Sequence, residues 1–217
     1  MSRHWPLHHL RLRSARLELR WPTDAELDDL GDLANKGVHD PQTMPFCVEW
    51  TDQQPAALAR GVAQFSWRAK GEWQPNKWSL PFGVFVDGEP VGVQELFATG
   101  FPTRRIVESG SWLGRAYQGR GYGSEMRRAL LSFAFGTLGA AVAETAAFAD
   151  NVASQAVSAA CGYVDNGTTM LVRRGEAAEL RRYRLTRAAW AVQPWPVTVH
   201  GFEACRPFFG LDGDTSW

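Results

Sequence analysis

The chain has 217 residues, of which 45% are hydrophobic and 21% charged, and its formal net charge is zero. This apolar content supports one well-formed core, so we expect a single domain with at most a short appendage. A pI near 7 and scattered basic residues disfavour a nucleic-acid partner and an anionic membrane surface. Most of the short arginine pairs are expected on solvated faces: Arg104-Arg105, Arg127-Arg128, Arg173-Arg174 and Arg181-Arg182.

Cysteine and histidine patterns predict neither a disulfide framework nor a metal site. Cys47, Cys161 and Cys205 are odd in number and lack metal-ligand spacing. The three histidines among the first nine residues have no nearby carboxylate or cysteine set. The N-terminus has no apolar signal region, and no window approaches the roughly 18 apolar residues of a membrane span. We therefore expect a soluble protein of a reducing cytoplasm.

The first third of the chain reads as a strand, a helix, a loop and a second helix. Residues 10–20 alternate apolar and polar side chains, which predicts a half-buried strand. Thr23 or Asp24 can cap the first helix. Prolines make residues 39–55 loop-like, and a second helix is expected over 56–70. The apolar stripes of the two helices are Leu27, Leu30 and Leu33, then Leu58, Val62, Phe65 and Ala69.

The middle of the chain predicts a hairpin, a further strand and a helix. The hairpin pairs Trp78–Val86 with Val91–Phe97 around an Asp-Gly-Glu-Pro turn. The strand spans Ile106–Leu113 and leads into a glycine-rich loop. The helix after that loop carries an apolar stripe of Met126, Ala129, Leu130, Phe133 and Ala134, with Glu125, Arg128 and Ser132 away from it.

The last elements predict a mixed α/β order without internal repeats. Ala141–Ala149 reads as a buried strand, although its alanine content keeps a helix open as an alternative. Asp150-Asn151 can cap a helix that ends at Gly162. Strands are then expected at Tyr163–Val172, Leu180–Thr186 and, beyond a break at Pro194-Trp-Pro196, Val197–Gly201.

The loop Gln118-Gly-Arg-Gly-Tyr-Gly123 predicts an anion site. Glycines at alternate positions let backbone amides approach phosphate oxygens, and the following helix adds its N-terminal dipole. A Walker loop would need Lys-Ser/Thr where this chain has Ser124-Glu125, and a dinucleotide fingerprint would need glycine at position 124. The spacing therefore favours a pyrophosphate-binding loop that is neither a Walker loop nor a dinucleotide fingerprint. The alternative is an ordinary glycine-rich turn without a ligand.

A polar stripe follows about thirty residues later. Asn151, Ser154 and Ser158 share one helix face, which can be either a ligand surface or simple capping and tight packing. Gln118-x-x-Gly121-x-Gly123, followed by Asn151-x-x-Ser154 and a Gly-Tyr pair, resembles the two acyl-CoA motifs of the GCN5-related N-acetyltransferase (GNAT) superfamily. The resemblance covers about residues 8–187.

The resemblance implies an α/β (α+β) GNAT fold with a mixed, mostly antiparallel sheet of six to seven strands flanked by helices. The acyltransferase domain would span residues 1–190, and residues 191–217 would form a C-terminal extension that packs or dimerises. The Arg-Leu-x-Leu-Arg run within residues 10–20 is similar to the Rim-type branch of ribosomal-protein acetyltransferases. Phrases such as Gly110-Ser-Trp-Leu-Gly114 and Cys205-Arg-Pro resemble an actinobacterial acyltransferase associated with succinyl-CoA.

The resemblance also implies direct acyl transfer from acetyl-CoA or succinyl-CoA to an amine. Glu108 is the expected base, directly or through water, unless it pairs with Arg104 or Arg105; Asp40 and Glu95 are weaker candidates. Ser158 stands where the family often has a tyrosine acid, so Ser154 is the expected partner of the leaving sulfur. The expected CoA-binding set is Trp112 and Leu113 (backbone), Gln118, Gly119, Arg120, Gly121, Tyr122, Gly123, Ser124, Asn151 and Ser154.

The acceptor is expected among the least family-like segments. Aromatic residues there can line a pocket or pack a core: Phe46, Trp50, Trp67, Trp73 and Trp78. A succinyl carboxylate would need a cationic partner, for which Arg104 and Arg105 are candidates. The expected activity is N-acylation of a protein or small-molecule amine, with homo-oligomerisation possible. The alternative is an acyl-CoA-binding regulatory module with weak or no transferase activity.

Overall fold

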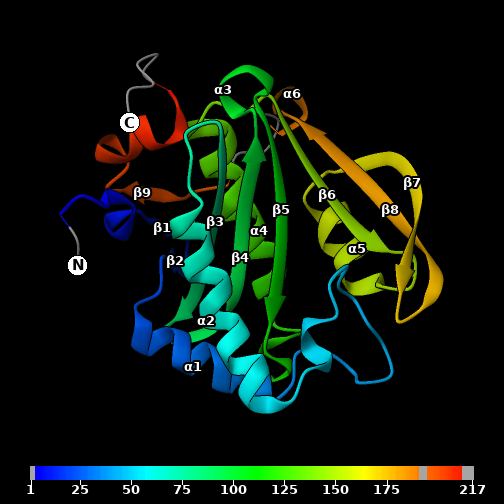
Figure 1. Ribbon diagram of the computed structural model, residues 1–217. Coiled ribbons are helices and arrows are strands. Elements are labelled where there is room, and N and C mark those ends of the chain that lie inside the picture. Colours follow the sequence, from blue (N-terminus) through cyan, green and yellow to red (C-terminus); the bar gives the residue numbers. More distant parts are fainter. Residues whose placement is uncertain (1–2, 191–194, 212–217) are drawn as a thin grey trace.

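A computed structural model describes residues 3–190 and 195–211 (Figure 1). One nine-stranded sheet runs through the molecule in the order β7-β8-β6-β5-β4-β3-β2-β1-β9. Its strands are β1 Arg11–Arg13, β2 Glu18–Arg20, β3 Lys77–Val86, β4 Glu89–Thr99, β5 Ile106–Leu113, β6 Val142–Phe148, β7 Val164–Arg173, β8 Glu176–Thr186 and β9 Thr198–His200. Only the β5–β6 pair is parallel, so the sheet is mostly antiparallel as predicted.

The helices lie on both faces of this sheet. They are α1 Asp24–Asn35, α2 Pro55–Gly71, α3 Phe101–Arg104, α4 Tyr122–Ser132, α5 Val152–Ala160 and α6 Arg187–Trp190. The described residues also form 3-10 or π-helical segments, namely η1 Pro6–His9, η2 Trp50–Asp52, η3 Arg115–Tyr117, the π-helical η4 Phe133–Thr137 and η5 Glu203–Phe209. In Figure 1, α1 and α2 cross one face of the central strands and α4 runs behind them. Each face therefore buries its own apolar core.

The prediction of six to seven strands is too low for two reasons. Residues 10–20 form two short antiparallel strands, not one, because the chain turns between Ser14 and Leu17. Apolar residues alternate within each strand, but their phase changes across residues 14–16, from Leu10 and Leu12 to Leu17 and Leu19. A prediction of one continuous strand overlooked this change of phase. The tail supplies the other extra strand, since β9 pairs with β1 in antiparallel register.

The local signals before the first helices are reproduced in the structure. Thr23 caps α1, and its hydroxyl and the Glu26 carboxylate form the reciprocal bonds of a capping box. The stripe expected on α2 is wrong at one position, because Phe65 is 42% exposed while its other members are buried. The hairpin of β3 and β4 turns at Asp87-Gly88, with φ of 50° and 89°, which is the left-handed backbone of a tight hairpin turn.

The described part of the tail belongs to the main core. Phe209 is fully buried and its ring lies 5.4 Å from that of Trp73 and 5.0 Å from that of Trp78. The indole N–H of Trp73 donates to the carbonyl of Phe208 at 2.8 Å. The break expected at Pro194 falls outside the described residues, whereas the strand expected around residues 197–201 is present as β9.

Candidate active site

The two parallel strands at the centre of the sheet separate and open a cleft. β6 pairs with β5 only from Ile106 to Glu108, opposite Val142 to Glu144. Beyond Glu108 none of the described strands pairs with this edge of β5, while β6 stays paired with β8 on its other edge from Val142 to Phe148. A cavity of about 970 Å³ fills the opening, bordered by β5, β6, the glycine loop, the start of α5 and the loop that follows α1.

The glycine loop forms one end of this cavity. Gly119 and Gly121 have φ of +71° and +82°, which side chains with a Cβ rarely adopt. Gly121 is the N-cap of α4 and no side chain caps that helix, so the first N–H groups of α4 have no capping acceptor among the described residues. Gly119, Gly121, Gly123 and Ser124 border the cavity. The loop therefore presents unpaired backbone donors and a helix dipole to an anion.

Three other members of the expected CoA-binding set lie differently. Gln118 borders the cavity, but its amide N–H₂ donates to the carbonyls of Val38 and Leu113, at 2.6 and 2.8 Å. Its side chain therefore joins the loop after α1 to the end of β5. Arg120 and Tyr122 do not border the cavity; Arg120 lies over the Tyr117 ring, and Tyr122 lies under the guanidinium of a residue from the β1–β2 turn.

That residue is Arg16, and it reveals an error in the expected helix faces. Glu125 was expected away from the apolar side of α4, yet it is only 5% exposed. Its carboxylate accepts bonds from the Ser14 hydroxyl and from the backbone and side chain of Arg16, at 2.7, 3.0 and 2.7 Å. Arg16 also donates to the carbonyl of Arg120 in the glycine loop at 3.1 Å. No local spacing links residue 16 to residue 125, so sequence reasoning missed this network.

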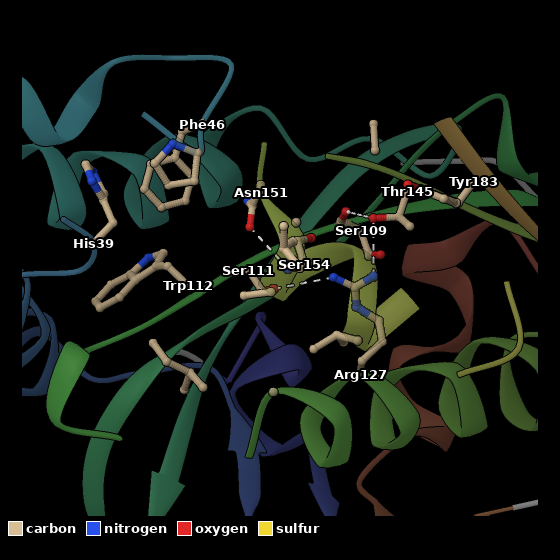
Figure 2. Close-up of a pocket in the computed structure, with 18 of the residues that line it drawn as sticks. His39, Phe46, Ser109, Ser111, Trp112, Arg127, Thr145, Asn151, Ser154 and Tyr183 are labelled. Atoms are coloured by element: carbon tan, nitrogen blue, oxygen red, sulfur yellow. Dashed lines mark hydrogen bonds between the residues drawn. The ribbon is translucent and has the colours of Figure 1, made fainter. Parts of the chain in front are cut away.

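The start of α5 borders the opposite side of the cavity. Asn151 caps the helix by accepting the backbone N–H of Ser154 at 3.1 Å, and both residues line the cavity (Figure 2). Ser158 is fully buried and its hydroxyl donates to the carbonyl of Ser154 at 3.1 Å. Ser158 is outside the cavity wall, whereas Ser154 is part of it.

Carboxylates gather where β5 and β6 meet. Glu108 and Glu144 are paired across these strands and both line the cavity. Among the described residues Glu108 has no ion-pair partner within 4.0 Å. Arg104 and Arg105 instead donate to the carbonyls of Thr99 and Leu138, and neither lines the cavity. The alternative in which Glu108 pairs with one of these arginines is therefore not found in the structure.

The two weaker carboxylate candidates differ in position. Asp40 borders the cavity, but its side chain accepts the backbone N–H of Gln42 at 2.9 Å. Glu95 does not border it. Burial raises the pKa of Glu95, while a 2.7 Å hydrogen bond from the Ser79 hydroxyl opposes the rise. Glu108 is thus the carboxylate that combines an open position with no partner of its own.

Phe46 and Trp112 line the cavity on the side of α1 and α2, and Trp50 packs between their rings without bordering it. The rings of Phe46 and Trp50 lie 5.2 Å apart, and Trp50 lies 5.7 Å from Trp112 of β5. His39 adds to this wall beside Phe46 (Figure 2). Of the aromatics expected near an acceptor, Trp67 is exposed on α2, and Trp73 and Trp78 lie in the core beneath the tail, away from the cavity.

The loop that carries these aromatics is fastened to the β7–β8 hairpin. Arg173 forms two 2.8 Å bonds to the carboxylate of Asp150 and a 3.2 Å bond to the carbonyl of Met44. Arg174 forms bonds of 2.8 and 2.6 Å to Asp52, and its backbone N–H donates to Glu49. We call these two arginines with their carboxylates the hairpin latch.

Comparison with known proteins identifies the class that this cleft and loop define. The profile of the acetyltransferase (GNAT) domain family matches residues 16–164, and the chain belongs to that family. It is therefore an acyltransferase of the CoA-dependent kind. No helix in the described ranges is long and apolar enough to cross a membrane, and no group of three or more potential metal ligands occurs among the same residues.

Solved structures share the fold at low sequence identity. RimL, a ribosomal L7/L12 alpha-N-protein acetyltransferase in complex with coenzyme A, is 19% identical over 80% of this chain and 95% of its own, with a TM-score of 0.64. A chimera of the spermidine N-acetyltransferase SpeG from Vibrio cholerae and hSSAT is 16% identical over 82% and 100%, with a TM-score of 0.64. The microcin C7 self-immunity acetyltransferase MccE, in complex with acetyl-CoA and AMP, is 18% identical over 80% and 93%, with a TM-score of 0.61.

Proposed function

We propose that this protein is an N-acyltransferase of the Rim type that moves an acetyl or succinyl group from CoA to a primary amine of a protein or small molecule. The observation that carries the proposal is the cleft between β5 and β6, with unpaired loop amides at one end and the unpaired Glu108 carboxylate at the other. Three cysteines without disulfide partners fit a reducing cytoplasm as its setting.

The glycine loop and the open edge of β5 would hold the donor. The amides from Gly119 to Ser124 suit the pyrophosphate, because they are unpaired and lie at a helix N-terminus. The uncovered edge after Glu108 suits the extended pantetheine arm, and the backbones of Trp112 and Leu113 are candidates to polarise the thioester carbonyl. Acyl-CoA supplies the activated carbonyl and a good leaving thiolate.

Glu108 would accept the proton that the amine must lose, directly or through one water. The amine nitrogen then bonds to the acyl carbon as the carbon–sulfur bond breaks, giving an amide and CoA without a covalent enzyme intermediate. Ser154 lies across the cavity and can donate a hydrogen bond to the sulfur. The aromatic wall of Phe46, Trp50 and Trp112 stands on the side from which the acceptor would approach. A protein N-terminus, a lysine and a small polyamine all fit this chemistry.

Release of free CoA across a panel of amines tests the proposal. We expect Glu108→Gln to lower kcat by about 10²-fold or more, because positioned general bases contribute about 10²–10⁴-fold. Ser154→Ala should lower kcat less and leave the Kd for CoA nearly unchanged. Glu89→Gln, which changes an exposed carboxylate on β4, is the matched control. Tight acyl-CoA binding without turnover on any amine would support the regulatory-module alternative instead.

A further inference from the structure

A buried arginine at the floor of the cavity has no charged partner. Arg127 lies on α4, is 3% exposed and lines the cavity. Its Nη1 donates to the Thr145 hydroxyl at 3.2 Å and its Nη2 to the Ser111 hydroxyl at 3.4 Å. Its Nε–H has no acceptor, and no carboxylate of the described residues lies within 4.0 Å of the guanidinium. Arg127 is therefore a buried charge whose contacts among the described residues are with neutral hydroxyl groups.

Burying a guanidinium this way is costly, since buried charges in proteins are normally paired. Other polar groups beside Arg127 are also incompletely bonded. The Ser109 hydroxyl is buried without a partner, although the Ser109 carbonyl accepts a bond from Thr145. The Tyr163 hydroxyl also has no partner within strict hydrogen-bond geometry; burial raises its pKa, and the nearby Arg127 guanidinium and Ser109 hydroxyl oppose the rise. The guanidinium of Arg127 and the hydroxyl of Ser109, both of which line the cavity, therefore keep hydrogen-bonding capacity that no carboxylate of the described residues uses.

Arg127 and the serines beside it lie on the face of β5 that packs against α4, the helix that begins at the glycine loop. Ser109 and Ser111 alternate with Glu108 and Trp112 along β5, so the two pairs point to opposite faces of the sheet. Arg127 rises from α4 to meet the serine face (Figure 2). Glu108 and the aromatic wall lie on the other face, towards α1 and α2. The helix that begins at the glycine loop therefore also provides the unpaired guanidinium.

From this arrangement we propose that Arg127 binds the terminal carboxylate of the acyl group, so that the preferred donor is a CoA thioester of a short dicarboxylic acid, of succinyl size. The inference rests on the proposed function and specifies its donor. A guanidinium can grip a carboxylate through two parallel bonds, and the hydroxyls of Ser109, Ser111 and Thr145 would complete the site. The methyl end of an acetyl group has no charge and no acceptor atom, so it cannot bind the Arg127 guanidinium.

A second arginine provides the competing site within the same cavity. Arg182 lines the cavity but its side chain is 52% exposed and lies 4.0 Å from the Glu144 carboxylate. Water and Glu144 both weaken its attraction for another anion. We therefore assign the acyl carboxylate to the buried Arg127 and use Arg182 as the matched control.

Measured affinities of CoA, acetyl-CoA and succinyl-CoA for the full-length protein test the assignment. The wild type should bind succinyl-CoA about 10- to 100-fold more tightly than acetyl-CoA, the range that a buried charge-assisted pair provides. Arg127→Gln and Arg127→Met should reduce that ratio to near unity while leaving the Kd for CoA within about twofold. Arg182→Gln should keep the wild-type ratio.

Thermal unfolding adds a readout that is independent of turnover. Because Arg127→Met removes an unpaired buried charge and keeps an apolar stem, its unliganded Tm should equal or exceed that of the wild type. Succinyl-CoA should raise the Tm of the wild type and of Arg182→Gln more than acetyl-CoA does, but raise the Tm of Arg127→Met no more than acetyl-CoA does.

Two results would overturn the inference and separate it from the proposed function. Equal affinity of the wild type for acetyl-CoA and succinyl-CoA, with both bound well, would refute the role of Arg127 and leave the acyltransferase proposal standing. Loss of the succinyl preference in Arg182→Gln rather than in the Arg127 variants would assign the carboxylate to Arg182. Failure of all three CoA species to bind would contradict the proposed function itself.

Discussion

Glu125 shows how a single buried carboxylate can hold a ligand loop in place. Burial opposes its ionisation, but hydrogen bonds from Ser14 and Arg16 outweigh this effect and keep its pKa below the usual value. Arg16 is fixed by that carboxylate and in turn donates to the carbonyl of Arg120. The shape of the glycine loop therefore depends on Glu125, although the Glu125 side chain does not line the cavity.

We predict that Glu125→Gln lowers the free energy of unfolding by about 2 kcal/mol at pH 7, since it removes a buried charge-assisted network. A depressed pKa stabilises the folded state above the unfolded value and loses that contribution as pH falls through the folded value. The gap between wild type and variant should therefore shrink as the pH is lowered below about 4.5. Urea unfolding at pH 7 and pH 3.5 measures this, with the exposed Glu89→Gln as control. A gap that widens at low pH would contradict the network described.

At the scale of elements, the loop of residues 41–52 beside the cavity is held in position by the β7–β8 hairpin. Arg173 ends β7 and Arg174 opens the turn to β8, and both contact carboxylates and carbonyls of residues 41–52 and 150. The pair of Arg174 with Asp52 lowers the pKa of Asp52, chiefly through the hydrogen bond from the guanidinium. Such a partly exposed latch gives modest energy but defines where the aromatic wall stands.

Arg174→Gln should make backbone amides of residues 40–53 exchange roughly two- to fivefold faster, because local opening becomes easier when one half of the latch is lost. Hydrogen exchange followed by mass spectrometry measures the change, and added salt should reduce the difference between the two proteins. Arg181→Gln is the matched control, since Arg181 lies on β8 and contacts Glu179 and Gln155 rather than the loop. Equal exchange in all three proteins would show that the latch does not restrain the loop.

Features that depend on neighbouring residues could be predicted from the sequence, whereas contacts between distant segments could not. The helix cap expected at Thr23 or Asp24, the turn expected within residues 87–90 and the glycines at 119 and 121 act within a few residues, and the structure has each of them there. The Arg16–Glu125 network, the hairpin latch and the buried Arg127 each join segments far apart in the chain or depend on which helix face is covered. A local sequence pattern does not reveal those contacts, because they form only when folding brings distant segments of the chain side by side.

For the whole molecule, the sheet and the tail share one hydrophobic core. β9 extends the sheet beyond β1, and η5 places Phe209 among Trp73, Trp78 and Phe133. The cleft lies on the other side of the sheet's centre, between β5 and β6. A core that spans this distance should couple the tail to the stability of the entire domain rather than to a separate unit.

Phe209→Ala should therefore lower the free energy of unfolding by about 3–5 kcal/mol, the usual loss for truncating a buried phenylalanine, and keep a single transition. Phe65→Ala, at an exposed position on α2, should cost less than about 1 kcal/mol. Denaturant unfolding followed by tryptophan fluorescence and by far-UV circular dichroism measures both, because the tryptophans beside Phe209 report the tail and the ellipticity reports the whole fold. Coincident curves are expected for each variant. An early fluorescence transition in Phe209→Ala, with the circular dichroism curve unmoved, would mean that the tail unfolds independently of the acyltransferase domain.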